Sequence, residues 1–347
     1  MTGRLTIQEI HEQPEVLARL LDEERPAVDT AVADLRRRPP SGVVLAARGS
    51  SDNAALYGHY LIETMLRIPV SLASPSVVTL YRRTPRLRGM LVIGLSQSGR
   101  SPDIVEYVRA ARGAGARTIA ITNEARSPLA RASHTTLLLH AGPERSVAAT
   151  KTYTAQLTVL SLLVGGLARE RRFVDGHRAL PDLVHRALAS EDEIAVAARR
   201  SRTMQRCLVI SRGYNYATAR EAALKLKETS YVAAEPLSSA DLLHGPIAVV
   251  GRRFPVIVIA PPGRVRPHLA RITRELSARG AHVIAVSSDP AIAALARTVL
   301  PVPSPVDERL SPHVYIVPLQ LFAHHLALAR GFDPDRPRGL RKVTRVL

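Results

Sequence analysis

The sequence has almost no cysteine: Cys207 is the only one among 347 residues. A single cysteine excludes a disulfide within the chain and any metal site built from several thiolates. Cys207 lies in the apolar run "RCLVIS" (206–211), which predicts a buried strand and an inert core thiol rather than a nucleophile. This usage of cysteine fits the reducing cytoplasm, where we expect the protein to work.

Long apolar runs are missing as well. The longest, "AQLTVLSLLVGGLA" (155–168), is too short to span a bilayer and predicts a buried helix. The N-terminal residues "MTGRLTIQEIHEQPEVL" mix polar and apolar side chains and lack the features of a secretory leader. We therefore expect neither export nor a membrane partner.

Aromatic residues make up only 4% of the chain, and tryptophan is absent. The formal net charge of +18 would by itself suggest a nucleic-acid partner. The arginines are scattered through every segment, however, and few aromatic rings are available to stack on bases. We therefore expect no nucleic-acid binding. An arginine-rich coding bias explains the charge, and the resulting surface favours anionic substrates.

Lysine is the scarcest charged residue. The chain has four lysines, Lys151, Lys225, Lys227 and Lys342, against 44 arginines. Arginine and lysine do similar work at a solvated surface, but only an amine can lose its proton or form an imine. Lysines that remain in such an arginine-rich chain are therefore candidates for chemistry.

Short apolar runs alternate with helical stretches along the chain. Buried strands are predicted at "GVVLAA" (42–47), "MLVIGL" (90–95), "RTIAIT" (117–122) and "TTLLLHA" (135–141). Helical segments such as "AALYGHYLIETML" and "SPDIVEYVRAARGAG" separate them. Alternation of this kind predicts a parallel sheet that is covered by helices on both faces.

The second half of the chain repeats this plan. "RCLVISRGYNYATAREAALKL" resembles "GVVLAARGSSDNAALYGHYLI", and "FPVIVIAPPG" parallels "GMLVIGLSQSG" about 164 residues earlier. The predicted fold is α/β, with two tandem, doubly wound parallel sheets of the flavodoxin-like, three-layer type. The predicted parts are an N-terminal helical segment (1–40), a first domain (41–170), a charged helical connector (171–199), a second domain (200–330) and a C-terminal tail (331–347).

Two serine-rich turns follow predicted strands, "ARGSSDNA" (47–54) and "GLSQSGRSPD" (94–103). Serine hydroxyls and helix N-terminal N–H groups together suit a phosphate, and the carboxyl ends of parallel strands are where ligands bind. The spacing is not that of a nucleotide P-loop. "SVAATKTYT" (146–154) adds Thr150 and Lys151 at a predicted helix start. Simple helix capping is the alternative explanation for each of these segments.

The stretch "EAALKLKE" (221–228) holds two of the four lysines. Helical spacing places Glu221, Lys225 and Glu228 on one face, with Lys227 elsewhere. An exposed ion-paired face is the alternative, but the interleaved alanines and leucines leave little purely solvated surface. Charged residues on a mostly apolar helix are poised for pKa shifts, which are common at active sites. His244 precedes a Gly-Pro turn in "LLHGP", where a lone histidine is more commonly structural.

These motifs together resemble a known family. The chain is similar to the isomerase half of glucosamine-6-phosphate synthase, which is built from two sugar isomerase (SIS) domains. The similarity runs from "QEIHEQP" through "GSS", "SQSG", "VAATK", "ALKLKE" and "HGP" to "LRKVT" (340–344). It implies that the sugar phosphate is held by a set of loop residues: Ser50, Ser51, Ser96, Gln97, Ser98, Arg100, Ser101, Ala148, Thr150 and Lys151. Ser101 stands where the synthase has threonine.

The resemblance also implies the catalytic residues. Glu228 would move a proton between C1 and C2, while Lys225 would stabilise the enediol charge with support from Glu221. His244 would assist ring opening from the partner subunit of a homodimer, and Lys342 would contact the open-chain sugar and form an imine. A positioned carboxylate and nearby cations are sufficient for such a proton shift, so we expect no cofactor and no metal.

Two departures from the synthase decide the predicted reaction. Met1 is followed by Thr2 rather than a nucleophilic cysteine, so we expect no glutamine-dependent amination. Arg100 replaces a glutamate of the synthase, as in stand-alone SIS-fold glucosamine-6-phosphate deaminases. The sequence therefore predicts an amino-sugar-phosphate deaminase and isomerase that converts glucosamine 6-phosphate to fructose 6-phosphate and ammonia.

Alternatives remain open at this point. A fructosamine-6-phosphate deglycase or a galactosamine-6-phosphate deaminase would use the same residues. A non-catalytic sugar-phosphate sensor would have no need of Glu228, His244 and Lys342 together. A DNA-binding regulator is disfavoured, because the first 40 residues are short for a helix-turn-helix domain.

Overall fold

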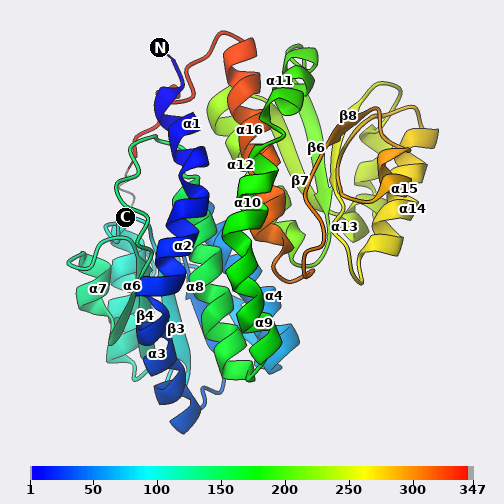
Figure 1. Ribbon diagram of the computed structural model, residues 1–347. Helices are drawn as coiled ribbons and strands as arrows, with labels where there is room; N and C mark the ends of the chain where they lie inside the picture. Colours follow the sequence, from blue (N-terminus) through cyan, green and yellow to red (C-terminus); the bar gives the residue numbers. More distant parts are fainter. Residues whose placement is uncertain (1, 343–347) are drawn as a thin grey trace. The chain divides into compact units, whose positions relative to one another are not determined.

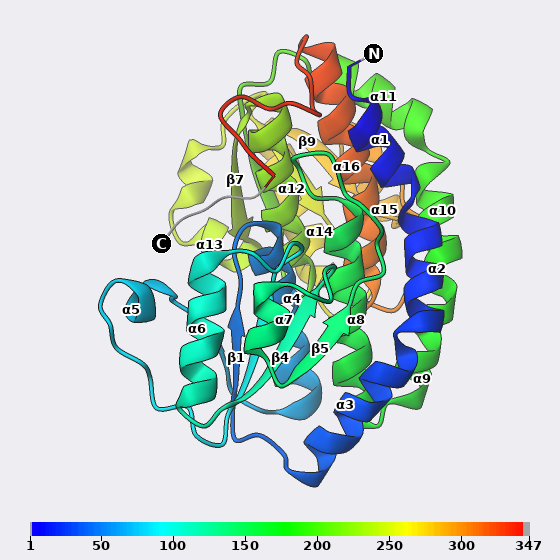
Figure 2. The same ribbon diagram turned by 90° about the vertical axis from the view of Figure 1, so that its left-hand side faces the viewer.

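The computed structural model describes residues 2–342. Its contacts divide the chain into two units, each built on one sheet. The β1–β5 unit comprises residues 15–144, 151–178 and 341–342, and the β6–β10 unit comprises residues 2–14, 145–150 and 179–340. Both can be followed in Figure 1 and, after a quarter turn, in Figure 2.

The β1–β5 unit contains five parallel strands in the order β2-β1-β3-β4-β5. They are β1 (Val43–Ala46), β2 (Val70–Leu72), β3 (Leu91–Leu95), β4 (Arg117–Thr122) and β5 (Thr135–Leu138). Its helices are α2 (Gln13–Glu23, whose first two residues are grouped with the other unit), α3 (Arg25–Arg37), α4 (Ser50–Leu66), α5 (Ser76–Thr79), α6 (Pro102–Gly113), α7 (Pro128–Ala132), α8 (Lys151–Ala168) and α9 (Arg171–Gly176). Every residue of β3 is buried, as expected for a strand covered on both faces.

The β6–β10 unit repeats this topology. Read from its other edge, the order β10-β9-β8-β6-β7 matches that of the first sheet. The strands are β6 (Arg206–Ser211), β7 (Ala233–Ser238), β8 (Pro255–Ile259), β9 (His282–Val286) and β10 (Thr298–Leu300). The helices are α1 (Arg4–His11), α10 (Leu180–Leu188), α11 (Glu191–Arg200), α12 (Asn215–Ser230), α13 (Ser239–Leu243), α14 (Arg266–Ala278), α15 (Pro290–Ala293) and α16 (Ser311–Ala329). Short 3₁₀ turns occur at His177–Ala179 and Pro246–Val249.

Each sheet has a core on both faces because its strand residues alternate in direction. In the β1–β5 unit, Val92 and Ala120 pack with Ile104 and Val108 of α6. On the other face α4 and α8 lie close together: a Cβ at Gly58 of α4 would meet the Leu160 side chain of α8 at 3.3 Å. In the β6–β10 unit the corresponding layers are α14 on one face and α12 with α16 on the other. The predicted three-layer α/β fold is confirmed.

The strand order positions the candidate site. In a sheet of this order the strand order reverses between two neighbouring strands whose following helices lie on opposite faces, and the crevice at the carboxyl ends of these two strands is where ligands bind. In the β1–β5 unit the two strands at this point are β1 and β3, so the turns that follow them border the crevice. In the β6–β10 unit they are β6 and β8.

The apolar segment 155–168 forms the buried helix that its composition predicted, within α8. Among residues 2–342, no helix combines the length and apolarity needed to cross a membrane. Cys207 lies in β6 with 2% of its surface exposed, and burial raises the pKa of its thiol to about 12. The predicted position of Cys207 in a buried strand is therefore confirmed, and a thiol with a raised pKa is expected to be unreactive.

Candidate active site

The turn between β3 and α6 gathers the first group of predicted binding residues. Ser96 is buried, and its Oγ lies 3.4 Å from the Oγ of Ser101, the residue immediately before α6. Ser98 Oγ accepts a hydrogen bond of 3.3 Å from the backbone N–H of Arg100, whose side chain is exposed. The backbone of Gln97 is fixed because its carbonyl accepts from Asn123 N at 3.0 Å.

Gly99 makes this turn possible. Its φ of 59° is in the left-handed region, and a Cβ there would lie 2.2 Å from Ser127 Oγ. Any other residue would collide with the segment before α7. The tight turn leaves the Ser96, Ser98 and Ser101 hydroxyls within six residues of chain, next to the N-terminus of a twelve-residue helix, where an anion is stabilised by the helix dipole.

The turn between β1 and α4 carries Ser50 and Ser51 at the first two positions of the helix. Ser51 is buried, and its Oγ accepts a hydrogen bond of 2.9 Å from Nε2 of Gln156 in α8. Gly49, just before α4, has φ 57°. The bond from Gln156 fixes the orientation of the Ser51 hydroxyl.

An ion pair joins the two serine turns, and sequence reasoning missed it. Arg48 Nε lies 2.7 Å from Asp103 Oδ2, and Asp103 Oδ1 accepts from Ile104 N at 2.9 Å. The Asp103 side chain is buried, whereas the Arg48 side chain is 57% exposed. The available signal for this ion pair was Asp103 in the first turn of α6, because a carboxylate that is buried there needs a cationic partner.

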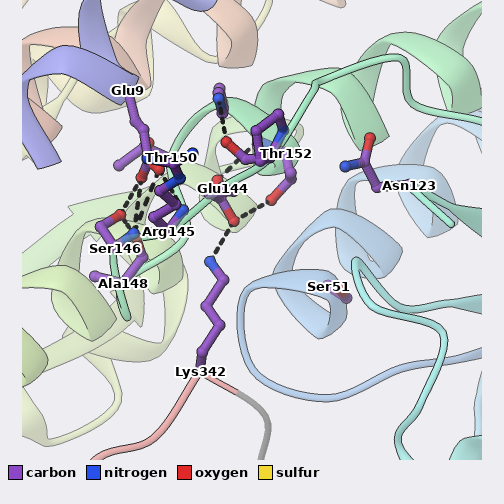
Figure 3. A network of polar contacts seen from close by, with 12 residues as sticks. Glu9, Ser51, Asn123, Glu144, Arg145, Ser146, Ala148, Thr150, Thr152 and Lys342 are labelled. Atoms are coloured by element: carbon purple, nitrogen blue, oxygen red, sulfur yellow. Dashed lines mark hydrogen bonds and ion pairs between the residues drawn. The ribbon is translucent and has the colours of Figure 1, made fainter. Parts of the chain in front are cut away.

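Lys151 and Lys342 lie in the same unit as these turns. Lys151 begins α8, is buried, and donates from Nζ to the carbonyl of Pro143 at 2.8 Å. Lys342 donates to Glu144 Oε2 at 2.6 Å, and Figure 3 shows this tail lysine directed at the Glu144 carboxylate. Glu144 also accepts from Thr152, from the backbone N–H at 3.1 Å and from Oγ1 at 2.8 Å. Sequence reasoning did not single out Glu144.

The charged face of α12 forms as predicted. Lys225 Nζ lies 3.4 Å from Glu221 Oε1 and 2.6 Å from Glu228 Oε2. The side chains of Glu221 and Lys225 are 0% and 3% exposed, whereas that of Glu228 is 23% exposed. Two carboxylates thus share one buried ammonium, and only Glu228 reaches solvent. Lys227 is exposed, in agreement with its predicted place off this face.

Ala148 and Thr150 are buried residues of the 145–150 loop, which belongs to the β6–β10 unit. The Ala148 carbonyl accepts from Ser146 Oγ at 3.0 Å, and the Thr150 carbonyl accepts from Gln320 Nε2 at 3.4 Å. Glu9 of α1 holds this loop through the backbone N–H of Arg145 and the hydroxyl of Ser146. The loop therefore presents backbone groups in a fixed position.

His244 follows α13, and its side chain is exposed. Its backbone N–H donates to the Asp241 carbonyl at 3.0 Å, and Gly245 follows with φ 127°. Within residues 2–342, no group of three or more histidine, cysteine or acidic side chains is arranged to hold a metal ion.

Comparison with known proteins assigns the segments that contain the two sheets to one family. A family model described as the SIS domain matches residues 39–165 and 202–330. The chain belongs to the SIS domain family. The two matched segments contain β1 to β5 and β6 to β10 respectively.

Relatives of this SIS chain are found among sequences and structures. A glutamine–fructose-6-phosphate aminotransferase (isomerizing) from Methanothermobacter thermautotrophicus is 38% identical over 98% of the chain. The chain spans only 57% of that relative's length. The solved C-terminal domain of a glucosamine-fructose-6-phosphate aminotransferase from Francisella tularensis superposes with a TM-score of 0.86 at 28% identity, over 96% of this chain and 98% of that one.

A third likeness concerns the fold alone. A glucosamine-6-phosphate deaminase from Thermotoga maritima superposes with a TM-score of 0.75 at 24% identity, over 99% of this chain and all of the other. The predicted resemblance to the isomerase half of the synthase is thus confirmed, and the SIS architecture is shared with a deaminase.

The two SIS segments hold different parts of the predicted site. The first contributes the serine turns with Arg100 and Lys151, and Lys342 joins the same unit from the tail. The second contributes Glu221, Lys225, Glu228 and His244. Within each unit the structure brings together Ser96 with Ser101, Lys342 with Glu144, and Lys225 with both glutamates.

Proposed function

We propose that this SIS protein is an isomerase and deaminase of an amino-sugar phosphate, with glucosamine 6-phosphate as substrate and fructose 6-phosphate and ammonia as products. The observation that carries the proposal is the Glu221–Lys225–Glu228 array on α12. A buried ion pair contributes little to folding compared with apolar residues of similar size. The burial of such a charged array within α12 therefore supports a catalytic role.

The array supports a stepwise proton-transfer mechanism. Once the sugar ring is open, the carboxylate of Glu228 accepts the proton from C2, and electrons move toward the C1 oxygen. The Lys225 ammonium stabilises the enediol-type charge. The C1 oxygen takes a proton from the 2-ammonium group, and the nitrogen electron pair then drives return of the Glu228 proton to C1, which leaves an imine at C2. Addition of water with loss of ammonia gives the ketose. One water is consumed for each ammonia released.

The serine turns supply the anchor for the substrate. The hydroxyls of Ser96, Ser98 and Ser101, the Ser51 hydroxyl and two helix N-termini form a set of donors suited to a phosphate dianion. Anchoring the phosphate end restricts the position of C1 and C2, which lowers the entropic part of the barrier. The names of the relatives, which refer to fructose 6-phosphate, support this substrate class.

The deciding experiment measures ammonia release from glucosamine 6-phosphate in the absence of glutamine, coupled to glutamate dehydrogenase. We expect release by the unaltered protein, a loss of at least about a thousandfold in Glu228→Gln, and an unchanged rate in Lys227→Met. Lys227 is a matched control because it is the exposed neighbour on the same helix. Saturable binding of the sugar phosphate without any release would instead support a sensor or a different amine substrate.

The exposed position of His244 supports a second part of the proposal, a homodimer in which His244 acts in the partner's site. Mixed dimers of Glu228→Gln and His244→Ala should regain about half of the native activity, because one of the two sites in each mixed dimer would then be intact. Absence of recovery in verified mixed dimers would contradict a shared site.

A further inference from the structure

Glu144 is a buried carboxylate to which neither the motifs nor the comparisons give a role. It lies in the loop between β5 and α8, and its side chain has no exposed surface. The carboxylate accepts two hydrogen bonds from Thr152, one of them from the backbone N–H in the first turn of α8. Both partners hold it at the N-terminus of α8, where a negative charge is favoured.

Lys342 is the cationic partner of this carboxylate, at 2.6 Å from Oε2. The two residues are 198 positions apart in the chain. Their surroundings differ: the Glu144 side chain is fully buried, whereas that of Lys342 is 25% exposed and belongs to the C-terminal tail. The carboxylate is therefore the fixed member of the pair, and the lysine is the member that can leave. A buried carboxylate that loses its ion-pair partner is strongly destabilised.

We propose that Glu144 is a positioning residue for Lys342. Its carboxylate holds the tail lysine as a charged ammonium at the N-terminus of α8 until an open-chain sugar phosphate competes for it. The proposal rests on the proposed function for the identity of the competing ligand, but the ion pair itself does not depend on any substrate.

The pair also determines how Lys342 becomes a nucleophile. An ammonium has no free electron pair, so addition to a sugar carbonyl requires that the lysine first lose a proton. Glu144 Oε2 is within hydrogen-bond distance. The Nζ–H bond breaks, an O–H bond forms on Glu144, and the two opposite charges cancel. The neutral amine then adds to the carbonyl carbon, the C=O π bond breaks, and the carbonyl oxygen takes the proton from Glu144, which gives a carbinolamine.

The first test needs no substrate. With only four lysines, the purified chain is labelled with a trace of an N-hydroxysuccinimide ester, which reacts with neutral, accessible amines, and the modification of Lys342 is measured relative to Lys227 by mass spectrometry. We expect Glu144→Gln to raise the Lys342 to Lys227 ratio at least about fivefold, because removal of one charge breaks the ion pair. Thr152→Val is the matched control, since it removes one hydrogen bond to the same carboxylate and leaves the ion pair. Its ratio should change less than about twofold.

A second variant covers the case in which Glu144→Gln does not fold. Glu144→Asp keeps the charge but withdraws the carboxylate by about one carbon–carbon bond, and should raise the ratio at least about twofold. Equal ratios in the native protein and in whichever of the two variants folds would overturn the proposal. So would a rise in Thr152→Val as large as that in Glu144→Gln, because the lysine would then respond to loop disorder.

The second test uses turnover. Glu144→Gln should lower kcat for ammonia release at least about tenfold, while the double variant with Lys342→Met should be no slower than Lys342→Met alone within about twofold. If the two substitutions lowered kcat independently, so that their effects multiplied in the double variant, a role of Glu144 through Lys342 would be contradicted. If the native protein releases no ammonia, the proposed function fails, and the labelling ratios still decide the role of Glu144.

Discussion

The turn after β3 and the turn after β8 are the same piece of the fold built twice, with different side chains. Gly99 and Gly263 stand 164 positions apart, both at positive φ. Around the first lie Ser96, Ser98 and Ser101, whereas the second has Ala260, Pro262 and Val265 at the corresponding positions. The backbone turn is kept in the second copy, but every hydroxyl is lost.

The helices that follow β1 and β6 show the opposite difference. At the positions of Glu221, Lys225 and Glu228 in α12, the first copy has Tyr57, Leu61 and Thr64 in α4. The SIS fold is therefore compatible with charged residues at these helix positions and also with uncharged ones. Anion-binding hydroxyls occur in one copy and a charged array in the other, which indicates that these residues are present for binding and chemistry and not for folding.

The position shared by Leu61 and Lys225 gives the sharpest test of this difference. Lys225→Met leaves the fully buried Glu221 without its cation, and should lower the free energy of unfolding by about 4 kcal/mol. Leu61→Met, a volume-conserving change at a fully buried site, should lower it by less than about 1.5 kcal/mol. Urea denaturation measures both. Equal losses would mean that the array is no more critical than ordinary core packing.

Removal of the hydroxyls makes the first turn resemble the second. The double variant of Ser96→Ala and Ser98→Ala should raise KM for the sugar phosphate at least about a hundredfold, because each hydrogen bond to a charged group contributes about 1.5–3 kcal/mol. Ser287→Ala removes a hydroxyl at the end of β9 in the second copy. It should leave KM within about twofold, and a comparable rise there would contradict the assignment of the phosphate to the first copy.

The long helices that end the two copies differ in their response to acid. Burial lowers the pKa of His324 in α16 from 6.5 to about 4, whereas α8 contains no histidine. Because the folded pKa lies below the unfolded one, the native state resists protonation. Stability is intact above about pH 6.5 and is lost as the pH falls toward 4.

His324→Gln should therefore reduce the acid sensitivity of the protein. Each unit of pKa corresponds to 1.36 kcal/mol, so between pH 7 and pH 5 the native protein should lose about 2 kcal/mol more than the variant. Denaturant midpoints at the two pH values measure this difference. Parallel losses in both proteins would assign the acid sensitivity to other groups.

The smallest expected effect on stability concerns a substitution in the first strand of the second copy. Cys207 in β6 corresponds to Val43 in β1, and both are buried. Cys207→Val should change the free energy of unfolding by less than about 1 kcal/mol, and the native thiol should stay unreactive toward thiol reagents at neutral pH. Rapid labelling of Cys207 in the folded protein would contradict an inert core thiol.

The sequence predicted the strands that are buried on both faces, because their apolar runs have no other explanation. The run 117–122 coincides with β4, and 90–95 and 42–47 match β3 and β1 within a residue or two. It missed β2, β7 and β10, which all lie at sheet edges, and β2 and β10 have only three residues each. Edge strands bury little surface and therefore show little apolar pattern.

Residues of the site were predicted where they belong to a local motif. Contacts between residues that are far apart in the sequence were missed. Glu221, Lys225 and Glu228 follow from helical spacing alone. Glu144 and Lys342, in contrast, meet across 198 residues, and Arg48 meets Asp103 across 55. No spacing rule relates such pairs, so only the folded chain reveals them.

The pair of Arg48 and Asp103 has a thermodynamic consequence for any ligand of the serine turns. This ion pair joins the two turns in the folded chain before an anion binds. Their conformational entropy is thus already lost on folding, and a ligand does not have to order them. Binding should resemble the filling of a rigid receptor, with little structural change in the turns and an affinity set by the donors alone.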